Sequence, residues 1–268
     1  MKKTILITGA TDGIGLETAK LLASDGHHLL IHGRNSQKLD SVKQVLAAIP
    51  DSGTVRSYLA DLSDLSEVTK LVTDISKENQ HLDVLINNAG VFKTNQPITA
   101  AGLDVRFVVN TISPYMLTQE LLPLLGNGGR VINLSSAAQA PVNIQALRGE
   151  VSLSDDMQAY AQSKLAITMW SNIMAQQTKA AGLTVIAVNP GSLLASKMVT
   201  EGFGVAGNDL AIGAKILQGL ALEEGMSEHS GEYYDNDSGK FAAAHPDASN
   251  LQKSAEVVQV IESIIKRV

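Results

Sequence analysis

Cysteine is absent from this chain of 268 residues, and basic residues are in the minority. Without cysteine there is no disulfide, no zinc–thiolate site and no thiol nucleophile, so the chain needs no oxidising compartment. Lys and Arg together number 21 against 27 Asp and Glu, which gives a formal charge of −6 at pH 7. Because no long basic run offsets that balance, neither nucleic acid nor an anionic membrane is an expected partner.

Long hydrophobic stretches are also missing. The apolar run at residues 4–8 is too short for a signal peptide and leads into a glycine turn, and nothing else approaches membrane-spanning length. We therefore expect a cytoplasmic protein without membrane insertion. The histidines His27, His28 and His229 have no partners at metal-ligand spacing, so no metal site is expected. A hydrophobic content of 44% permits one sizeable core, and we expect a single domain over residues 1–268.

Short apolar runs rich in β-branched residues alternate with longer segments of helical pattern. Strands are expected at residues 4–8, 28–32, 54–58, 82–86, 130–134, 184–188 and 232–235, and helices near 14–25, 36–48, 64–79, 103–125, 157–181 and 249–266. The strands lack strict alternation, as parallel strands covered on both faces do. The order predicts an α/β fold with a doubly wound parallel sheet, whose ligand lies beyond the carboxyl ends of the strands.

A glycine-rich turn follows the first strand. The segment Thr8-Gly9-Ala10-Thr11-Asp12-Gly13-Ile14-Gly15 spaces its glycines as G-x-x-x-G-x-G. Backbone N–H groups and the helix dipole at such a turn can receive a pyrophosphate. Ordinary turns also use glycine, but a strand before the turn and an amphipathic helix after it favour nucleotide binding.

Tyr160 and Lys164 lie four residues apart, on one face of a predicted helix. A tyrosine that exchanges protons near neutral pH needs its pKa lowered from about 10 toward 7, or about 4 kcal/mol. A lysine charge about 5 Å away supplies about 3 kcal/mol at an effective dielectric of about 20. The alternative is a core-facing tyrosine beside a lysine that reaches water, and the spacing alone favours that alternative.

The remaining motifs follow one another in a recognisable order: the glycine turn, Asn87-Asn88-Ala89-Gly90, Asn110, Ser136, Tyr160, Lys164 and Pro190-Gly191. In this order they resemble the short-chain dehydrogenase/reductase family over roughly residues 4 to 240. The resemblance implies a single-domain Rossmann fold with seven parallel strands, helices on both faces and a nicotinamide cofactor. Residues 137–156 lengthen the gap before Tyr160, are similar to the retinol dehydrogenase and protochlorophyllide reductase branches, and are expected to form a surface flap.

The resemblance implies a catalytic role for four residues. Tyr160 is the acid/base that donates a proton to a carbonyl oxygen in reduction or removes one from an alcohol in oxidation. Lys164 lowers the pKa of that phenol and binds the nicotinamide ribose. Ser136 polarises the reacting oxygen, and the family register favours it over Ser135. Asn110 matches the fourth catalytic position of the family.

Pro114 lies four residues after Asn110 in the same predicted helix and lacks the N–H that would bond the carbonyl of residue 110. That carbonyl is free to hold a water between Lys164 and solvent, as the family's proton relay requires. The alternative is an ordinary proline kink.

Cofactor choice depends on the end of the second strand. Gly33 occupies the place where NAD-using relatives carry an acidic residue, and the guanidinium of Arg34 beside it suits a 2′-phosphate. One charge-assisted hydrogen bond of about 1.5 to 3 kcal/mol corresponds to roughly a 10- to 100-fold preference. The resemblance thus implies NADP(H) over NAD(H). One departure argues against NADP(H): Asp12 stands where NADP-using relatives often have a basic residue. The alternative role for Arg34 is an ordinary solvated surface charge.

Other cofactor positions come from the resemblance alone. Asp61-Leu62 match the adenine position, although Asp61 suits a cap of the next helix equally well. The pattern P-G-x-x-x-T is broken by Ala195, so Ser196 holds the carboxamide if the loop carries one extra residue. In full, the expected cofactor residues are Gly9, Thr11, Asp12, Gly13, Ile14, Gly15, Arg34, Asn35, Asp61, Leu62, Asn88, Ala89, Gly90, Tyr160, Lys164, Pro190, Gly191 and Ser196.

An apolar series follows Gly191, near residues 192–210, where the family places a substrate lid. Its members are Leu193, Leu194, Met198, Val199, Phe203 and Val205. An apolar carbonyl or alcohol suits such a lid, while packing of the same residues onto the protein is an equal alternative. The predicted helices at 103–125 and 157–181 form dimer faces in many relatives, so a homo-oligomer is compatible with the sequence.

The expected function is an NADP(H)-dependent oxidoreductase that transfers hydride between nicotinamide and a carbonyl or alcohol. One alternative is a catalytically silent NADP(H)-binding sensor or scaffold of the same fold, although such proteins usually lose the tyrosine or the lysine. Sugar-nucleotide epimerases and dehydratases share Y-x-x-x-K, but typically have G-x-x-G-x-x-G and a longer substrate domain.

Overall fold

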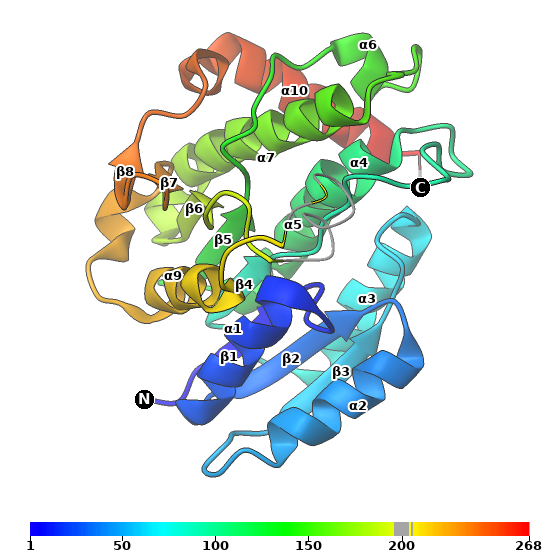
Figure 1. Cartoon of the computed structure of the whole chain (residues 1–268). Helices are drawn as coiled ribbons and strands as arrows, with labels where there is room; N and C mark the ends of the chain where they lie inside the picture. Colours follow the sequence, from blue (N-terminus) through cyan, green and yellow to red (C-terminus); the bar gives the residue numbers. More distant parts are fainter. Residues whose placement is uncertain (196–203, 205, 268) are drawn as a thin grey trace.

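One twisted sheet organises the protein, and helices cover both of its faces (Figure 1). The computed structural model describes residues 1–195, 204 and 206–267. In the described part the sheet has eight strands in the order β3-β2-β1-β4-β5-β6-β7-β8. They are β1 (Thr4–Ile7), β2 (His28–Gly33), β3 (Val55–Leu59), β4 (Val84–Asn87), β5 (Arg130–Leu134), β6 (Thr184–Asn189), β7 (Tyr233–Asp235) and β8 (Lys240–Ala242).

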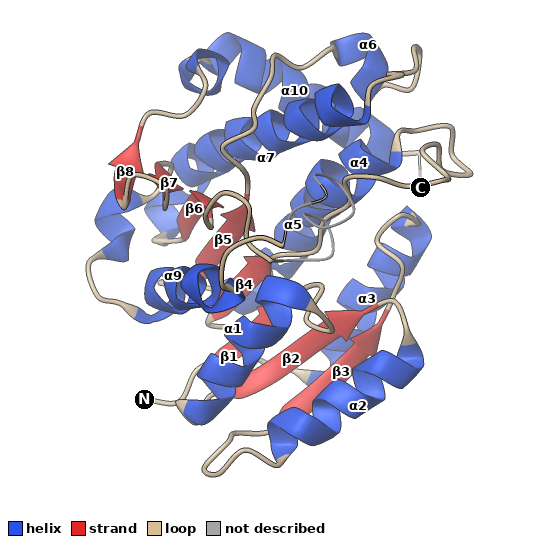
Figure 2. Cartoon of the chain, viewed as in Figure 1, coloured by secondary structure: helices blue, strands red, loops and turns tan. Residues whose placement is uncertain are grey.

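The helices of the described residues alternate with these strands (Figure 2). They are α1 (Gly13–Ser24), α2 (Ser36–Ala47), α3 (Leu65–Glu78), α4 (Val105–Phe107), α5 (Ser113–Leu125), α6 (Ile144–Leu147), α7 (Asp156–Thr178), α9 (Leu210–Leu222) and α10 (Leu251–Ile265). A π-helical turn, η1 (Val108–Ile112), joins α4 to α5, and the 3-10 turns are η2 (Lys179–Ala181), η3 (Met226–His229) and η4 (Pro246–Ser249). This arrangement confirms the predicted single-domain, doubly wound Rossmann fold.

Alternate residues of each strand enter different cores. Ile5 and Ile7 pack with α1, α2 and α9, whereas Leu6 between them packs on the opposite face with α3, α5 and α7. All three are fully buried, and each such side chain contributes about 1.5 to 3 kcal/mol by leaving water. Burial on both faces explains why the strands lack polar alternation.

The predicted number of strands is wrong by one, and the sheet is not entirely parallel. β1 to β7 run parallel, but β8 returns antiparallel to β7, with Tyr233 opposite Ala242 and Asp235 opposite Lys240. The chain reverses through residues 236–239, where Gly239 has φ +68°, a left-handed conformation that favours glycine. A three-residue edge strand has too short a pattern to be read from the sequence.

The predicted helix over residues 103–125 is interrupted. Its middle is the π-helical turn η1, where the N–H of Ser113 bonds the carbonyl of Val108, five residues back. Pro114 follows immediately in the first turn of α5. Because proline has no N–H for the carbonyl of residue 110, the α-helical ladder cannot continue through this point.

Residues 137–156, the expected flap, contain α6 and are attached to the body of the protein. Leu147 of α6 is fully buried and belongs to the core formed by α7 and α10. The N–H of Asn143 donates to Oε1 of Gln162 on α7 at 2.9 Å. That the segment works as a flap stays a prediction.

The last helix, α10, packs along α7 (Figure 1). Val257, Val258 and Ile261 of α10 are buried in the core that α7 shares, and Glu262 accepts a hydrogen bond from the hydroxyl of Tyr115 at 2.9 Å. The expected homo-oligomer stays a prediction. None of the described helices has the length and apolar character needed to cross a bilayer.

Candidate active site

A cavity of about 510 Å³ opens where the strand order reverses, at the carboxyl ends of β1 and β4. It is lined by most of the residues expected to bind the cofactor: Gly9, Thr11, Asp12, Gly13, Ile14, Arg34, Asn35, Asp61, Leu62, Asn88, Ala89, Gly90, Tyr160, Lys164 and Pro190. Gly15, Gly191, Asn110 and Ser136 lie outside the lining, and Ser196 lies outside the described residues. The structure thus brings the glycine turn, the end of β2 and the Tyr160 region into one cavity.

The glycine turn borders the cavity with backbone rather than side chains. Gly9 and Gly13 have φ of +66° and +55°, which other residues adopt only with strain. A Cβ added to Gly15 would lie 2.4 Å from Nδ2 of Asn88, so Gly15 permits close packing rather than contact with a ligand. Nδ2 of Asn88 donates to the carbonyls of Thr8 and Gly9, at 2.8 and 3.0 Å.

The fit of a dinucleotide can be judged from this turn. α1 begins at Gly13, with Asp12 as its N-cap, and the first turn of the helix faces the cavity through Gly13 and Ile14. A helix N-terminus beside a glycine turn attracts a phosphate through its N–H groups and its dipole. The residues present fit the diphosphate of a nicotinamide dinucleotide.

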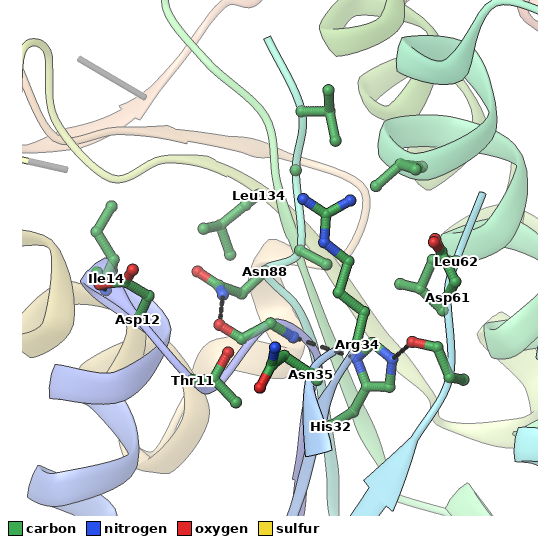
Figure 3. A pocket seen from close by; sticks show the side chains of 18 of the residues that line it. Thr11, Asp12, Ile14, His32, Arg34, Asn35, Asp61, Leu62, Asn88 and Leu134 are labelled. Atoms are coloured by element: carbon green, nitrogen blue, oxygen red, sulfur yellow. Dashed lines mark hydrogen bonds between the residues drawn. The ribbon is translucent and has the colours of Figure 1, made fainter. Parts of the chain in front are cut away.

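His32, which the sequence reasoning missed, supports the glycine turn from β2 (Figure 3). Its Nδ1 accepts from the N–H of Gly9 at 3.3 Å, and its Nε2 lies 3.0 Å from the carbonyl oxygen of Ala60. Only 3% of the residue is exposed, and burial lowers the pKa of His32 to about 4. The imidazole is therefore neutral, with its proton assigned to Nε2 by these partners. The sequence signal that could have identified His32 is a histidine inside an otherwise apolar strand.

Arg34 projects from the end of β2 into the cavity (Figure 3). It is exposed, and none of the described residues makes a hydrogen bond or ion pair with its guanidinium. Gly33 before it is close-packed, since an added Cβ would lie 2.6 Å from Cγ2 of Thr11. An acidic residue at position 33 would therefore displace Thr11.

Two further charged residues, Asp12 and Lys38, line the same cavity as Arg34. Nζ of Lys38, another lining residue that was not anticipated, is 3.6 Å from Oδ2 of Asp12. Asn35 caps α2 by accepting from the N–H of Lys38 at 2.9 Å. The Asp12 carboxylate is therefore partly balanced by Lys38.

Asp61 lines the cavity, and the alternative that it caps the next helix is wrong. The N-cap of α3 is Asp64, which accepts from the N–H of Ser66 at 2.9 Å. Asp61 instead accepts from the N–H of Ser63 at 2.9 Å.

Tyr160 and Lys164 lie on one face of α7, and both line the cavity. Only 4% of Lys164 is exposed, and its Nζ donates to the carbonyl of Leu134 at 2.7 Å. That Nζ lies 5.6 Å from the ring centroid of Tyr160. Burial lowers the pKa of Lys164 to about 8. The alternative of a lysine reaching water does not hold.

Two effects shift the pKa of the Tyr160 phenol in opposite directions. Burial raises its pKa, and a hydrogen bond with the Ser136 side chain opposes the rise. The ring of Phe92 lies beside it, with 5.1 Å between ring centroids. The protein's own groups therefore leave the pKa of the phenol above its ordinary value.

The two neighbouring serines have different surroundings. Oγ of Ser135 donates to the carbonyl of Lys164 at 2.8 Å and lies 2.7 Å from Oγ1 of Thr168, so it fastens β5 to α7. Ser136 instead directs its side chain to Tyr160. Its carbonyl accepts from the hydroxyl of Tyr233 at 3.1 Å. Ser135 lines the cavity and Ser136 does not, so the choice of Ser136 stays a prediction.

Asn110 lies in the π-helical turn, and its side chain bonds Val91 and Ser163. Oδ1 accepts from the N–H of Val91 at 2.7 Å, and Nδ2 donates to the carbonyl of Val91 and to Oγ of Ser163, both at 2.9 Å. The side chain thus holds the loop after β4 against α7. The proton relay through the carbonyl of residue 110 stays a prediction.

The Pro190-Gly191 loop is braced by the turn of the β7–β8 hairpin, which the sequence reasoning did not anticipate. Nδ2 of Asn236 donates to the carbonyl of Pro190, and Asp237 accepts from the N–H of Ser192, both at 2.8 Å. Only Pro190 of this loop lines the cavity. In the described part of the chain, no group of three or more His, Cys, Asp or Glu residues is arranged to hold a metal ion.

This combination of fold and cavity agrees with the family comparison. The model of the short chain dehydrogenase family matches residues 3–204. The chain therefore belongs to the short-chain dehydrogenase/reductase family of oxidoreductases, in the branch similar to the retinol dehydrogenases.

Particular relatives support that branch. Retinol dehydrogenase 12 of Bos taurus is 32% identical over 245 residues, covering 87% of this chain and 77% of the relative. The chloroplastic short-chain dehydrogenase TIC 32 A of Brassica napus is 28% identical, covering 86% of this chain and 79% of the relative. Among solved structures, a short chain dehydrogenase from Burkholderia cenocepacia in complex with NADP has a TM-score of 0.71 and 26% identity, covering 87% of this chain and 95% of that one.

Proposed function

We propose that this protein is an NADP(H)-dependent oxidoreductase that interconverts a carbonyl compound and an alcohol, with Tyr160 as the acid/base. The observation that carries the proposal is the single cavity bordered by the glycine turn, Arg34, Tyr160 and Lys164. Gly9, Gly13 and Ile14 would hold the diphosphate, and Lys164 the ribose beside the nicotinamide.

A bound nicotinamide supplies the hydride and, when oxidised, a second positive charge near the phenol. In reduction, Tyr160 would donate its proton to the substrate's carbonyl oxygen; in oxidation, the phenolate would take the proton of the alcohol hydroxyl. Ser136 donates a hydrogen bond to the same oxygen and stabilises its developing charge. Lys164, with its ammonium 5.6 Å from the ring centroid of Tyr160, would favour the phenolate through its positive charge.

Arg34 supports NADP(H) over NAD(H). Its guanidinium has no partner among the described residues, and Gly33 leaves no acidic side chain to repel a 2′-phosphate. The Burkholderia cenocepacia relative forms a complex with NADP. We expect Arg34→Gln to weaken NADPH binding roughly 10- to 100-fold and to leave NADH binding unchanged.

Titration calorimetry with both cofactors tests this assignment. Lys43→Gln is the matched control, because Lys43 is an exposed cation of α2 that does not line the cavity. Tighter binding of NADH than of NADPH by the unsubstituted protein would overturn the preference.

An apolar aldehyde, ketone or alcohol is the proposed class of substrate. The support is the Phe92 ring beside Tyr160, the exposed Leu193 after Gly191, and relatives named for retinol, an apolar alcohol. Leu194, also expected in the lid, is instead buried in the protein. Met198, Val199, Phe203 and Val205, also expected in the lid, lie outside the described residues.

A screen of such compounds with NADPH or NADP⁺ tests the reaction, with Tyr160→Phe run beside the unsubstituted protein. Turnover that survives in Tyr160→Phe would remove the phenol from the mechanism. NADPH binding without turnover of any compound would favour the catalytically silent sensor or scaffold.

A further inference from the structure

A buried arginine lies beneath the catalytic helix, outside the cavity. Arg106 of α4 is 1% exposed. Asp104, itself 5% exposed, binds it through two contacts, from Nε to Oδ1 at 2.8 Å and from Nη2 to Oδ2 at 2.6 Å. This bidentate pair alone balances the buried charge.

The guanidinium makes a third contact that charge balance does not require. Nη1 donates to Oδ1 of Asp156, the first residue of α7, whose side chain is 42% exposed. The contact joins α4 to α7 across 50 positions of the sequence. Its effect is to fix the N-terminal end of the helix that carries Tyr160.

A second attachment lies on the other side of Tyr160. Nδ2 of Asn110 donates to Oγ of Ser163 at 2.9 Å, and Oγ1 of Thr111 donates to the carbonyl of Ser163 at 2.8 Å. Oγ of Ser163 in turn donates to the carbonyl of Tyr160 at 2.6 Å. The helical turn that carries the phenol is therefore held at residue 156 and at residue 163.

Without the first attachment, the Asp155 cap alone would hold the helix end next to Tyr160. In an α-helix the N–H of residue 160 bonds the carbonyl of residue 156, so the backbone at Tyr160 is ordered only if the first turn is. First turns lack half of the helical hydrogen bonds and open more readily than helix interiors.

We propose that the Arg106–Asp156 ion pair is a positioning device for the catalytic tyrosine. Arg106 and Asp156 touch neither substrate nor cofactor; they keep the first turn of α7 closed, so that the phenol stays beside Ser136. The proposal rests on the proposed role of Tyr160 as the acid/base.

Asp156→Ala is the informative variant, since it removes the attachment and leaves the Arg106–Asp104 pair intact. Replacing Arg106 would strand the buried Asp104 carboxylate and risk unfolding. Asp155→Asn is the matched control. Asp155 caps the same helix by accepting from the N–H groups of residues 157 and 158, and asparagine keeps that cap while removing the same charge.

We expect Asp156→Ala to lower kcat about tenfold, short of the roughly hundredfold cost of a 1 Å misplacement, with KM and Kd for NADPH unchanged. Asp156→Glu should recover part of the loss, and Asp155→Asn should behave like the unsubstituted protein. Independently of turnover, hydrogen exchange of the amides at 157–161 should be faster in Asp156→Ala than in Asp155→Asn.

Unchanged exchange, or a kcat equal to that of Asp155→Asn, would overturn the positioning role. The two proposals can fail separately. Turnover that survives in Tyr160→Phe defeats the proposed function. An inactive Tyr160→Phe beside an unaffected Asp156→Ala defeats only the positioning role.

Discussion

Lys164 should make the stability of the protein depend on pH in a predictable direction. Its side chain is almost fully enclosed, and burial lowers the pKa to about 8. In the unfolded chain a lysine keeps its proton to about pH 10.4. Between these values the unfolded state holds one proton more than the native state, so the free energy of unfolding rises with pH.

The magnitude follows from the same two pKa values. Below about pH 8 the buried ammonium is charged and its full desolvation cost is present; above about pH 10.5 the cost is gone. The difference corresponds to about 3 kcal/mol of unfolding free energy. The hydrogen bond from Nζ to the carbonyl of Leu134 offsets part of the cost at neutral pH.

Urea unfolding from pH 7 to 10.5 would measure this effect, with Lys164→Met as the comparison. Both proteins should carry Tyr160→Phe, so that the neighbouring phenol does not titrate. We expect the unfolding free energy of the lysine protein, relative to Lys164→Met, to increase by about 3 kcal/mol across this range. A difference that stays constant with pH would refute the buried, charged lysine.

Two further predictions concern the glycine turn. Gly15→Ala should weaken NADPH binding and lower stability by about 1 to 3 kcal/mol, because the added Cβ would meet Asn88 at 2.4 Å; calorimetry and urea unfolding check both. Gly219→Ala is its control, since that Cβ would meet only the flexible carboxylate of Glu223, at 3.0 Å in α9. Burial lowers the pKa of His32 to about 4. As pH falls from 6.5 to 4, the unfolded chain takes up the proton before the native protein does, so the free energy of unfolding should fall by about 3 kcal/mol. His32→Gln, whose amide can keep both hydrogen bonds, should remove this pH dependence. The same acid-unfolding series in His32→Gln and in the unsubstituted protein would contradict the prediction.

The strands were the most predictable part of the fold. β1, β2, β3, β5, β6 and β7 lie within one residue of their expected bounds, and only β4 begins two residues later than expected. Strands buried on both faces are short apolar runs with clear ends. β8 and α9 were missed. The three residues of β8 show no periodicity, and α9 is apolar on most sides, including its exposed Ile212, so no amphipathic pattern marks it as a helix.

Most positions that border the cavity could be predicted because they follow the end of a strand, whereas Tyr160 and Lys164 were found by their spacing on one helix face. The partners of those side chains could not be predicted. Asn110 bonds Val91 and Ser163, which lie 19 and 53 positions away, and no local pattern specifies such pairs. Arg106 was overlooked for a related reason: a charged residue in an apolar helix is ordinarily solvent-exposed, and only the fold reveals the two carboxylates that permit its burial.

The π-helical turn between α4 and α5 also constrains the length of this segment. It places the consecutive residues Asn110 and Thr111 against the same residue, Ser163, whereas neighbours in an α-helix point about 100° apart. Because a π-helical turn takes one residue more than an α-helical turn, deleting one residue here would restore an α-helical turn and break the paired contacts of residues 110 and 111 with Ser163. Natural variation should therefore change the identity of residues 108–112 more readily than their number.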